Sequence, residues 1–142
     1  MATINPTMFE CFSSDAMNGV HNLGSDTINM ALSNTAPTHA TDDEFVDITE
    51  ISAGDGYTTK GDTVSIASST HTGLVYSLVG TGTVEWTSTG TIGPFRYPIL
   101  FNETATNDEL ICSYDIGSEI TLNNGDSYII DMAQTILDID WT

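Results

Sequence analysis

Carboxylates are the most numerous side chains in this sequence that could do chemistry, and the chemistry they suggest is calcium binding. The chain has 20 Asp and Glu residues. Calcium takes about six to eight oxygen ligands, which loop carboxylates can supply. The candidate segments are TDDEF (Asp42, Asp43, Glu44), AGDGYTTKGD (Asp55, Asp62) and ATNDE (Asn107, Asp108, Glu109). None has the residue order of an EF-hand loop, so we interpret them as solvated loop acids and predict no bound metal or cofactor.

Catalytic motifs are missing from the sequence. His21, His39 and His71 occur singly, without neighbours at metal-ligand spacing, and we expect solvated side chains. There is no nucleophile elbow, phosphate-binding loop or H-E-x-x-H motif. A chain with almost no cations also offers few electrophilic groups. We therefore predict no catalytic residues and a protein that is not an enzyme.

The charge balance restricts the partners of the chain. Two basic residues, Lys60 and Arg96, stand against the 20 acidic ones, and the formal net charge is −18. Charged residues make up 15% of the chain, against a usual value of about 25%, so the imbalance comes mainly from missing Lys and Arg. Affinity for nucleic acids depends largely on cations that displace counterions from phosphates. We therefore predict no binding to DNA or RNA.

Neither a membrane nor an export pathway is indicated. A membrane-spanning helix needs about 20 consecutive apolar residues, and the sequence has no such run. The first residues, MATINPTMFECF, lack the basic and apolar regions of a secretory signal.

Cys11 and Cys112 lie far apart and form neither a C-x-x-C motif nor a zinc-ligand spacing. Two cysteines in a chain of 142 residues do not make a disulfide framework. We expect both to be reduced and semi-buried.

A short helix is predicted near the N-terminus. Phe9, Phe12, Ala16 and Val20 recur every three or four residues, as on one face of a helix, and Gly19 would end it. We expect residues 1–24 to form an N-terminal arm or short helix and residues 25–142 to form one β-sandwich domain.

From about residue 25 the pattern is typical of an antiparallel all-β fold. Apolar residues alternate, and turn residues recur roughly every ten positions. The expected strands are TINMALS (27–33), FVDITEI (45–51), TVSIAS (63–68), GLVYSLVG (73–80), TVEWTST (83–89) and FRYPILF (95–101). Strands with one apolar face each predict a two-sheet sandwich, jelly-roll or immunoglobulin-like. Pro98 cannot donate to a sheet ladder, so we expect its strand at an edge or at a bulge.

Residues 116–132 predict a hairpin. A three-residue loop, 123–125, with Gly125 in the left-handed conformation pairs Leu122 with Asp126 and Ile120 with Tyr128. This register is favoured because it places all the apolar residues on one face. They are Ile116, Ile120, Leu122, Tyr128, Ile130 and Met132.

Several long segments resemble a family of small virion proteins of tailed bacteriophages and prophages. The matching pieces are MFECFSSDAMNGVHNLGSDTINMALSNTAPTHATDDEFVDITEI, AGDGYTTKGDTVSI and GTIGPFRYPILFNETATNDELICSYDIGSEITLNNGDSYIIDM, which cover nearly the whole chain. Their combination is specific, whereas each piece alone would be weak. Both basic residues fall in such segments, Lys60 in G-Y-T-T-K-G and Arg96 in G-P-F-R-Y.

The resemblance implies a β-sandwich capsid cement or decoration protein. Its partner would be the major capsid protein, and it would form a homo-oligomer, a dimer or a trimer, on the outer capsid surface after synthesis in the host cytoplasm. The candidate contacts with the shell or a sister subunit are Phe9, Phe12, Met17 and Arg96. For the N-terminal segment, packing against its own sandwich is an alternative, and Arg96 could instead pair with a carboxylate of its own chain.

Two other functions stay open at this point. A tail or connector component of the virion needs the same compact β domain. A carbohydrate- or calcium-binding module belongs to another class, and its sugar platform would use the aromatic residues Trp86, Phe95, Tyr97 and Phe101. Alternation along strands favours packing of these rings in the core.

Overall fold

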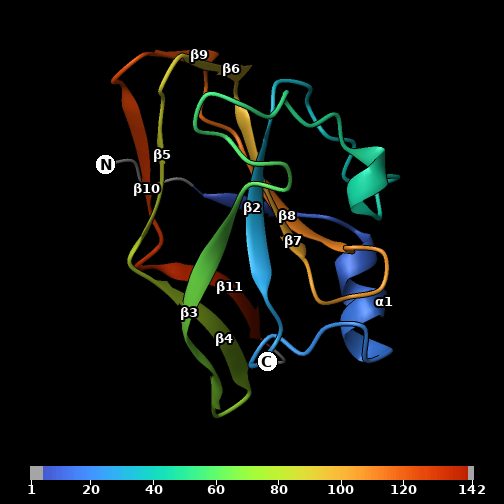
Figure 1. The fold of residues 1–142 in the computed structure, drawn as a ribbon. Helices are drawn as coiled ribbons and strands as arrows, with labels where there is room; N and C mark the ends of the chain where they lie inside the picture. The colour runs from blue at the N-terminus through green and yellow to red at the C-terminus, as the bar shows by residue number, and fades with distance from the viewer. Residues whose placement is uncertain (1–4, 141–142) are drawn as a thin grey trace.

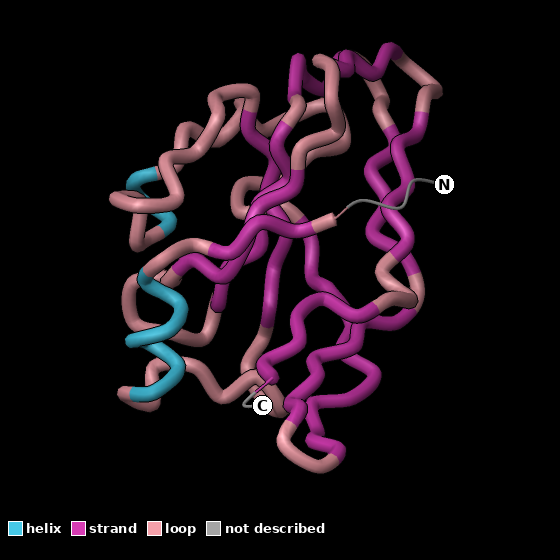
Figure 2. The backbone as a smooth tube through the Cα atoms, turned by 180° about the vertical axis from the view of Figure 1, so that it is seen from behind, coloured by secondary structure: helices cyan, strands magenta, loops and turns pink. Residues whose placement is uncertain are grey.

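The computed structural model describes residues 5–140 and consists mostly of β-strands (Figures 1 and 2). The all-β prediction is confirmed. The elements are β1 (Pro6–Met8), α1 (Cys11–Met17), β2 (Ile28–Ser33), the 3-10 helix η1 (Phe45–Asp47), β3 (Asp62–Thr72), β4 (Val75–Thr81), β5 (Thr83–Thr87), β6 (Thr91–Phe95), β7 (Tyr97–Asn102), β8 (Leu110–Tyr114), β9 (Ile120–Asn123), β10 (Ser127–Asp131) and β11 (Thr135–Asp140). Among these residues, no helix is long and apolar enough to cross a membrane.

Seven strands form one antiparallel sheet in the order β1-β8-β7-β2-β3-β4-β11. Strands β1 and β11 are therefore its two edges. Two further pairs, β10-β5 and β6-β9, form small sheets. In both views α1 lies on one side of the central strands, and the β5-β10 pair lies on the other (Figures 1 and 2).

The two small sheets belong to one long, bent ribbon. Segments 75–95 and 120–140 run antiparallel side by side, because β4 pairs with β11, β5 with β10 and β6 with β9. Backbone hydrogen bonds hold both bends: Met132 N donates to Gly82 O at 2.9 Å, and Ser88 N donates to Asp126 O at 2.8 Å. The ribbon therefore keeps its backbone groups paired while it changes direction.

This ribbon corrects the hairpin predicted for residues 116–132. Gly125 is left-handed, with φ of 92°, as expected, but β9 pairs with β6 and β10 pairs with β5. The prediction of one apolar face is confirmed, since all six residues belong to or pack against the same core cluster. Alternation specifies the face of a strand but not its partner, and both strands have their partners in the other half of the ribbon.

The central strands are buried on both faces, which differs from the single apolar face expected. In β2, Met30 and Leu32 belong to the larger core cluster, whereas Ala31 belongs to a smaller one. The smaller cluster also contains residues of β7, β8 and the N-terminal segment: Phe9, Ile99, Phe101 and Leu110, with Cys11, Phe45 and Ile48 packed against it. The chain around α1 and η1 thus covers the second face of the sheet.

One local prediction was wrong, and another was wrong in part. Residues 45–51 do not form a strand. Phe45–Asp47 is a 3-10 helix, because Asp47 Oδ2 accepts hydrogen bonds from Asp43 N and Glu44 N at 3.0 and 3.1 Å and so stabilises a local turn. Pro98 lies in β7, which is central between β2 and β8 and not at an edge. The expected bulge is matched by a register shift between Leu100 and Phe101 in the pairing of β7 with β8. Pro98 is tolerated there because the pairing of β7 with β8 begins at Ile99, past the residue that lacks a donor.

The N-terminal helix is confirmed and joins the core. Gly19, with φ of 77°, follows the helix end as expected. Phe12, on α1, is buried in the larger cluster together with residues of the sheet. The division at residues 1–24 and 25–142 stays a prediction, and residues 1–4 and 141–142 lie outside the described range.

A substitution at Gly61 tests how closely the G-Y-T-T-K-G turn packs against β2. The φ of this glycine is +69°, and an added Cβ would collide with the carbonyl oxygen of Met30. We expect Gly61→Ala to lower the free energy of unfolding by more than about 2 kcal/mol, measured by urea denaturation. Gly73→Ala is the matched control, because Gly73 has φ of +61° and open space around its Cα. Gly73→Ala should lower the free energy of unfolding by about 1 kcal/mol. If both variants lower it equally, the argument from close packing at Gly61 is contradicted.

Candidate functional site

The single arginine forms a two-pronged ion pair within the chain. Arg96 Nε and Nη2 donate to Asp115 Oδ1 and Oδ2 at 2.7 and 3.0 Å. The guanidinium carbon also lies 5.3 Å from the ring centroid of Tyr97, in a cation–π contact. The intramolecular interpretation of Arg96 is therefore confirmed, whereas a contact with another subunit stays a prediction.

The ion pair with Arg96 favours the ionised form of the Asp115 carboxyl. Hydrogen bonds from Arg96, and then from the backbone N–H of Gly117, hold the pKa of this carboxyl below its usual value. The backbone also fixes the position of the arginine, since Arg96 N donates to Ser33 O and Ile116 N donates to Arg96 O. The loop after β8 is thus joined to the junction between β6 and β7.

The single lysine is neutralised in the same way. Lys60 Nζ lies 2.8 Å from Asp108 Oδ2 and 3.3 Å from Glu103 Oε1. These contacts join the G-Y-T-T-K-G turn to the loop between β7 and β8. Both basic side chains of the sequence are therefore committed to ion pairs inside the fold, and the excess of negative charge faces outward.

A buried hydrogen-bond chain shapes the turn before Lys60. The hydroxyl of Tyr57 accepts from Leu32 N at 3.0 Å and donates to Glu50 Oε1 at 2.7 Å. The same carboxylate oxygen accepts the backbone N–H of Lys60. Tyr57 and Leu32 are buried, so the chain satisfies a hydroxyl and a backbone N–H that have no access to water, whereas Glu50 and Lys60 are half-buried.

An apolar groove runs between α1 and the edge strand β11. Its volume is about 750 Å³, and we call it the α1–β11 groove. It is lined by Met8, Phe9, Glu10, Phe12, Ser13, Ala16, Met17, Leu137, Asp138 and Ile139. Three of the four predicted contact residues are in this lining. Phe9 and Phe12 are 2% and 6% exposed and serve the chain's own core, whereas Met17 is 75% exposed. The fourth, Arg96, is not part of the lining.

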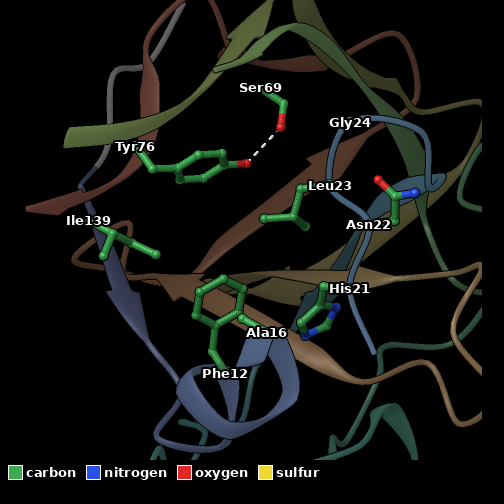
Figure 3. A pocket seen from close by; sticks show the side chains of 9 residues that line it. All are labelled: Phe12, Ala16, His21, Asn22, Leu23, Gly24, Ser69, Tyr76 and Ile139. Carbon is green, nitrogen blue, oxygen red and sulfur yellow. Dashed lines mark hydrogen bonds between the residues drawn. The ribbon is translucent and has the colours of Figure 1, made fainter. Parts of the chain in front are cut away.

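A second pocket, of about 540 Å³, adjoins this groove and shares Phe12, Ala16 and Ile139 with it (Figure 3). Leu23 lies between Tyr76 on one side and Phe12 and His21 on the other (Figure 3). The hydroxyls of Tyr76 and Ser69 hydrogen-bond at 2.7 Å. The pocket extends the apolar surface from α1 toward β3 and β4.

Two histidines are less exposed than predicted. His21 is half-buried beside Phe12, with ring centroids 5.2 Å apart, and burial lowers its pKa. His39 Nε2 lies 2.7 Å from Ser113 Oγ, and its ring packs on Phe9. Only His71 is exposed as expected. Tertiary packing around the N-terminal segment, which the sequence pattern did not reveal, encloses the other two.

The acidic loop segments mostly serve the backbone. Asp42 Oδ2 accepts from Thr38 N, and Asp55 Oδ2 accepts from Thr91 N. Asp62 Oδ1 accepts from Thr63 N, and Glu109 Oε2 from Asn107 N. Across residues 5–140, no group of three or more His, Cys, Asp or Glu side chains is arranged to hold a metal ion.

The aromatic rings proposed for a sugar platform belong to the core. Trp86, Phe95 and Phe101 are 3%, 0% and 0% exposed, and only Tyr97 is half-buried. The core interpretation is therefore confirmed for the three buried rings. The two thiols are not bonded to each other, as expected; Cys11 is half-buried as predicted, whereas Cys112 is fully buried. Burial raises the pKa of both to about 12.

Sequence reasoning missed one wall of the groove. The segment TILDID (135–140) supplies Leu137, Asp138 and Ile139, and it was not among the expected strands. Its alternation of apolar and polar residues was a signal for a strand. Its position at the sheet edge, beside α1, was not readable from that pattern.

Comparisons with protein-family models, with curated proteins and with solved structures found no match in any of the three. The resemblance to phage virion proteins therefore rests on the sequence segments quoted above.

Tyr57→Phe tests the buried hydrogen-bond chain. The variant leaves Leu32 N and Glu50 without the hydroxyl, so we expect the free energy of unfolding to fall by about 1–3 kcal/mol in urea denaturation. Tyr114→Phe is the matched control, because Tyr114 is equally buried but its hydroxyl bonds no backbone group among residues 5–140. A loss for Tyr57→Phe no larger than that of the control would contradict this role.

Asp115→Asn tests the Arg96 pair through its pH dependence. Because the folded-state pKa of Asp115 is lowered, its contribution to stability is present above its unfolded pKa, about 3.9, and is lost as the pH falls through the folded value. We expect the variant to be less stable than wild type at pH 7, and the difference to shrink below about pH 4. Urea midpoints across this range measure it. Glu85→Gln on β5 is the matched control, because it removes the charge of an exposed acid that has no basic partner among the described residues. An equal loss of stability at pH 7 in both variants would contradict a role for the Arg96 pair.

Proposed function

We propose that the chain is a structural protein of a tailed-phage virion, a capsid cement protein that binds the outer capsid surface and bridges subunits of the major capsid protein. The resemblance of its segments to phage virion proteins supports this function. The single structural observation that carries it is the commitment of both basic side chains to internal ion pairs.

The charge arrangement favours the exterior of a shell filled with DNA. With Lys60 and Arg96 neutralised by their neighbours, the surface presents the excess of the 20 acidic residues. Such a surface repels packaged DNA, so the inner wall of the shell is an unfavourable place for it. It attracts cationic surfaces, and this attraction also speeds encounter with a partner that exposes lysine or arginine.

The mechanism we propose is linkage between binding and shell stability. A protein that binds the assembled shell, and not separated subunits, stabilises the assembled state by its binding free energy. Many symmetry-related copies add their contributions. We further propose that the large sheet and the small sheets form a two-sheet β-sandwich, jelly-roll or immunoglobulin-like, and that the chain acts as a homo-oligomer, a dimer or a trimer, with closed symmetry.

A tail or connector component is the second candidate within the virion. The acidic exterior and the all-β fold support it equally, because both positions require a compact domain that assembles with other proteins. Copy number separates the two functions, since a cement protein is present in a fixed ratio to the shell subunit, whereas a ring or connector component of the tail is present in only a few copies.

The deciding measurement is the number of copies per particle of the phage that encodes the chain. We expect quantitative mass spectrometry of purified particles to give a ratio to the major capsid protein near one, or a simple fraction of one. A few copies per particle would assign the chain to the tail or connector. Its absence from purified particles would contradict both virion functions.

A further inference from the structure

The α1–β11 groove combines an apolar floor with an exposed apolar side chain at its rim. Phe12 and Leu137 are buried, and Ala16 and Ile139 are half-buried. Met17, at the end of α1, is 75% exposed, although methionine usually gains about 1.5–3 kcal/mol by full burial. A flexible thioether at the edge of an apolar groove is well suited to contact a partner side chain.

The rim of this groove is acidic. Glu10 and Asp138 both line it, and both are exposed, although Asp138 Oδ1 also accepts a hydrogen bond from Ser77 Oγ on β4. Neither carboxylate is paired with Lys60 or Arg96, which contact Glu103, Asp108 and Asp115 instead. The groove therefore offers apolar surface flanked by negative charge.

We infer that the α1–β11 groove docks an apolar segment of the shell subunit that is flanked by lysine or arginine. Apolar side chains of the segment would bury against Phe12, Met17 and Ile139, and its cations would lie near the rim, above all near the carboxylate of Glu10. This inference rests on the proposed function for the identity of the partner. Charge complementarity selects the occupant, because such a segment supplies the positive charge that the groove lacks.

A second copy of the chain fits the groove poorly. It carries a formal charge of −18, and its two basic side chains are already paired, so it would bring acidic surface against an acidic rim. Like charges that face each other across an interface oppose association.

The test measures binding of the purified full-length protein to shells assembled without it, by co-sedimentation at low and physiological salt. Met17→Gln removes the apolar contact at an exposed helical position and keeps a good helix former. Val46→Thr is its control, because Val46 is 81% exposed on η1 and is not part of the groove. Glu10→Lys reverses a rim charge, and Glu85→Lys makes the same change on β5, outside the groove.

We expect wild type to bind, Met17→Gln to bind about tenfold more weakly, and Glu10→Lys to bind more weakly with less dependence on salt, while both controls bind like wild type. Equal urea midpoints verify that the variants fold. If wild type binds and the groove variants bind equally well, the inference is overturned and the proposed function stands. If wild type does not bind, the proposed function itself fails. A homo-oligomer that dissociates in Met17→Gln would instead assign the groove to a second copy.

Discussion

Burial of the central strands on both faces is the constraint on which the rest of the structure depends. Strands β2, β7 and β8 carry buried residues at almost every position, so a cover is required on each side. On one side the cover is the bent ribbon, which supplies much of the larger core cluster and consists of β4, β5 and β6 paired with β9, β10 and β11. On the other side the chain around α1 and η1 supplies residues of the smaller core cluster. The position of α1 beside the edge strand β11, and hence the groove, follows from this requirement.

Scarcity of positive charge gives the two basic side chains a structural use. Each joins segments distant in the sequence, Lys60 to the loop after β7 and Arg96 to the loop after β8. These bridges are partly exposed, and exposed ion pairs contribute little to stability individually. Their larger effect is on recognition, since no free cation remains on the described surface to offset the acids. Association then depends on apolar contact and on the charge of the partner.

Prediction from sequence worked where the signal is local. The helix around Phe12 and its end at Gly19 follow from spacing and from the conformational freedom of glycine, and both are confirmed. The segment at residues 45–51 shows the limit of this reasoning. Its apolar alternation resembled a strand, but hydrogen bonds from the backbone to the Asp47 side chain stabilise a turn instead. Two local signals were present there, the apolar alternation and the ability of Asp47 to accept backbone hydrogen bonds, and the hydropathy pattern contains only the first.

The sequence by itself determined the all-β class, the apolar face of residues 116–132, the left-handed turn at Gly125 and the excess of negative charge. These properties depend on side-chain type and on a period of two, which are local. Only the tertiary structure decided that β9 pairs with β6, that Arg96 meets Asp115, and that α1 and β11 enclose a groove. The physical reason is that backbone donors and acceptors are the same at nearly every residue. Strand partners are therefore selected by packing between residues far apart in the chain, which no local pattern encodes.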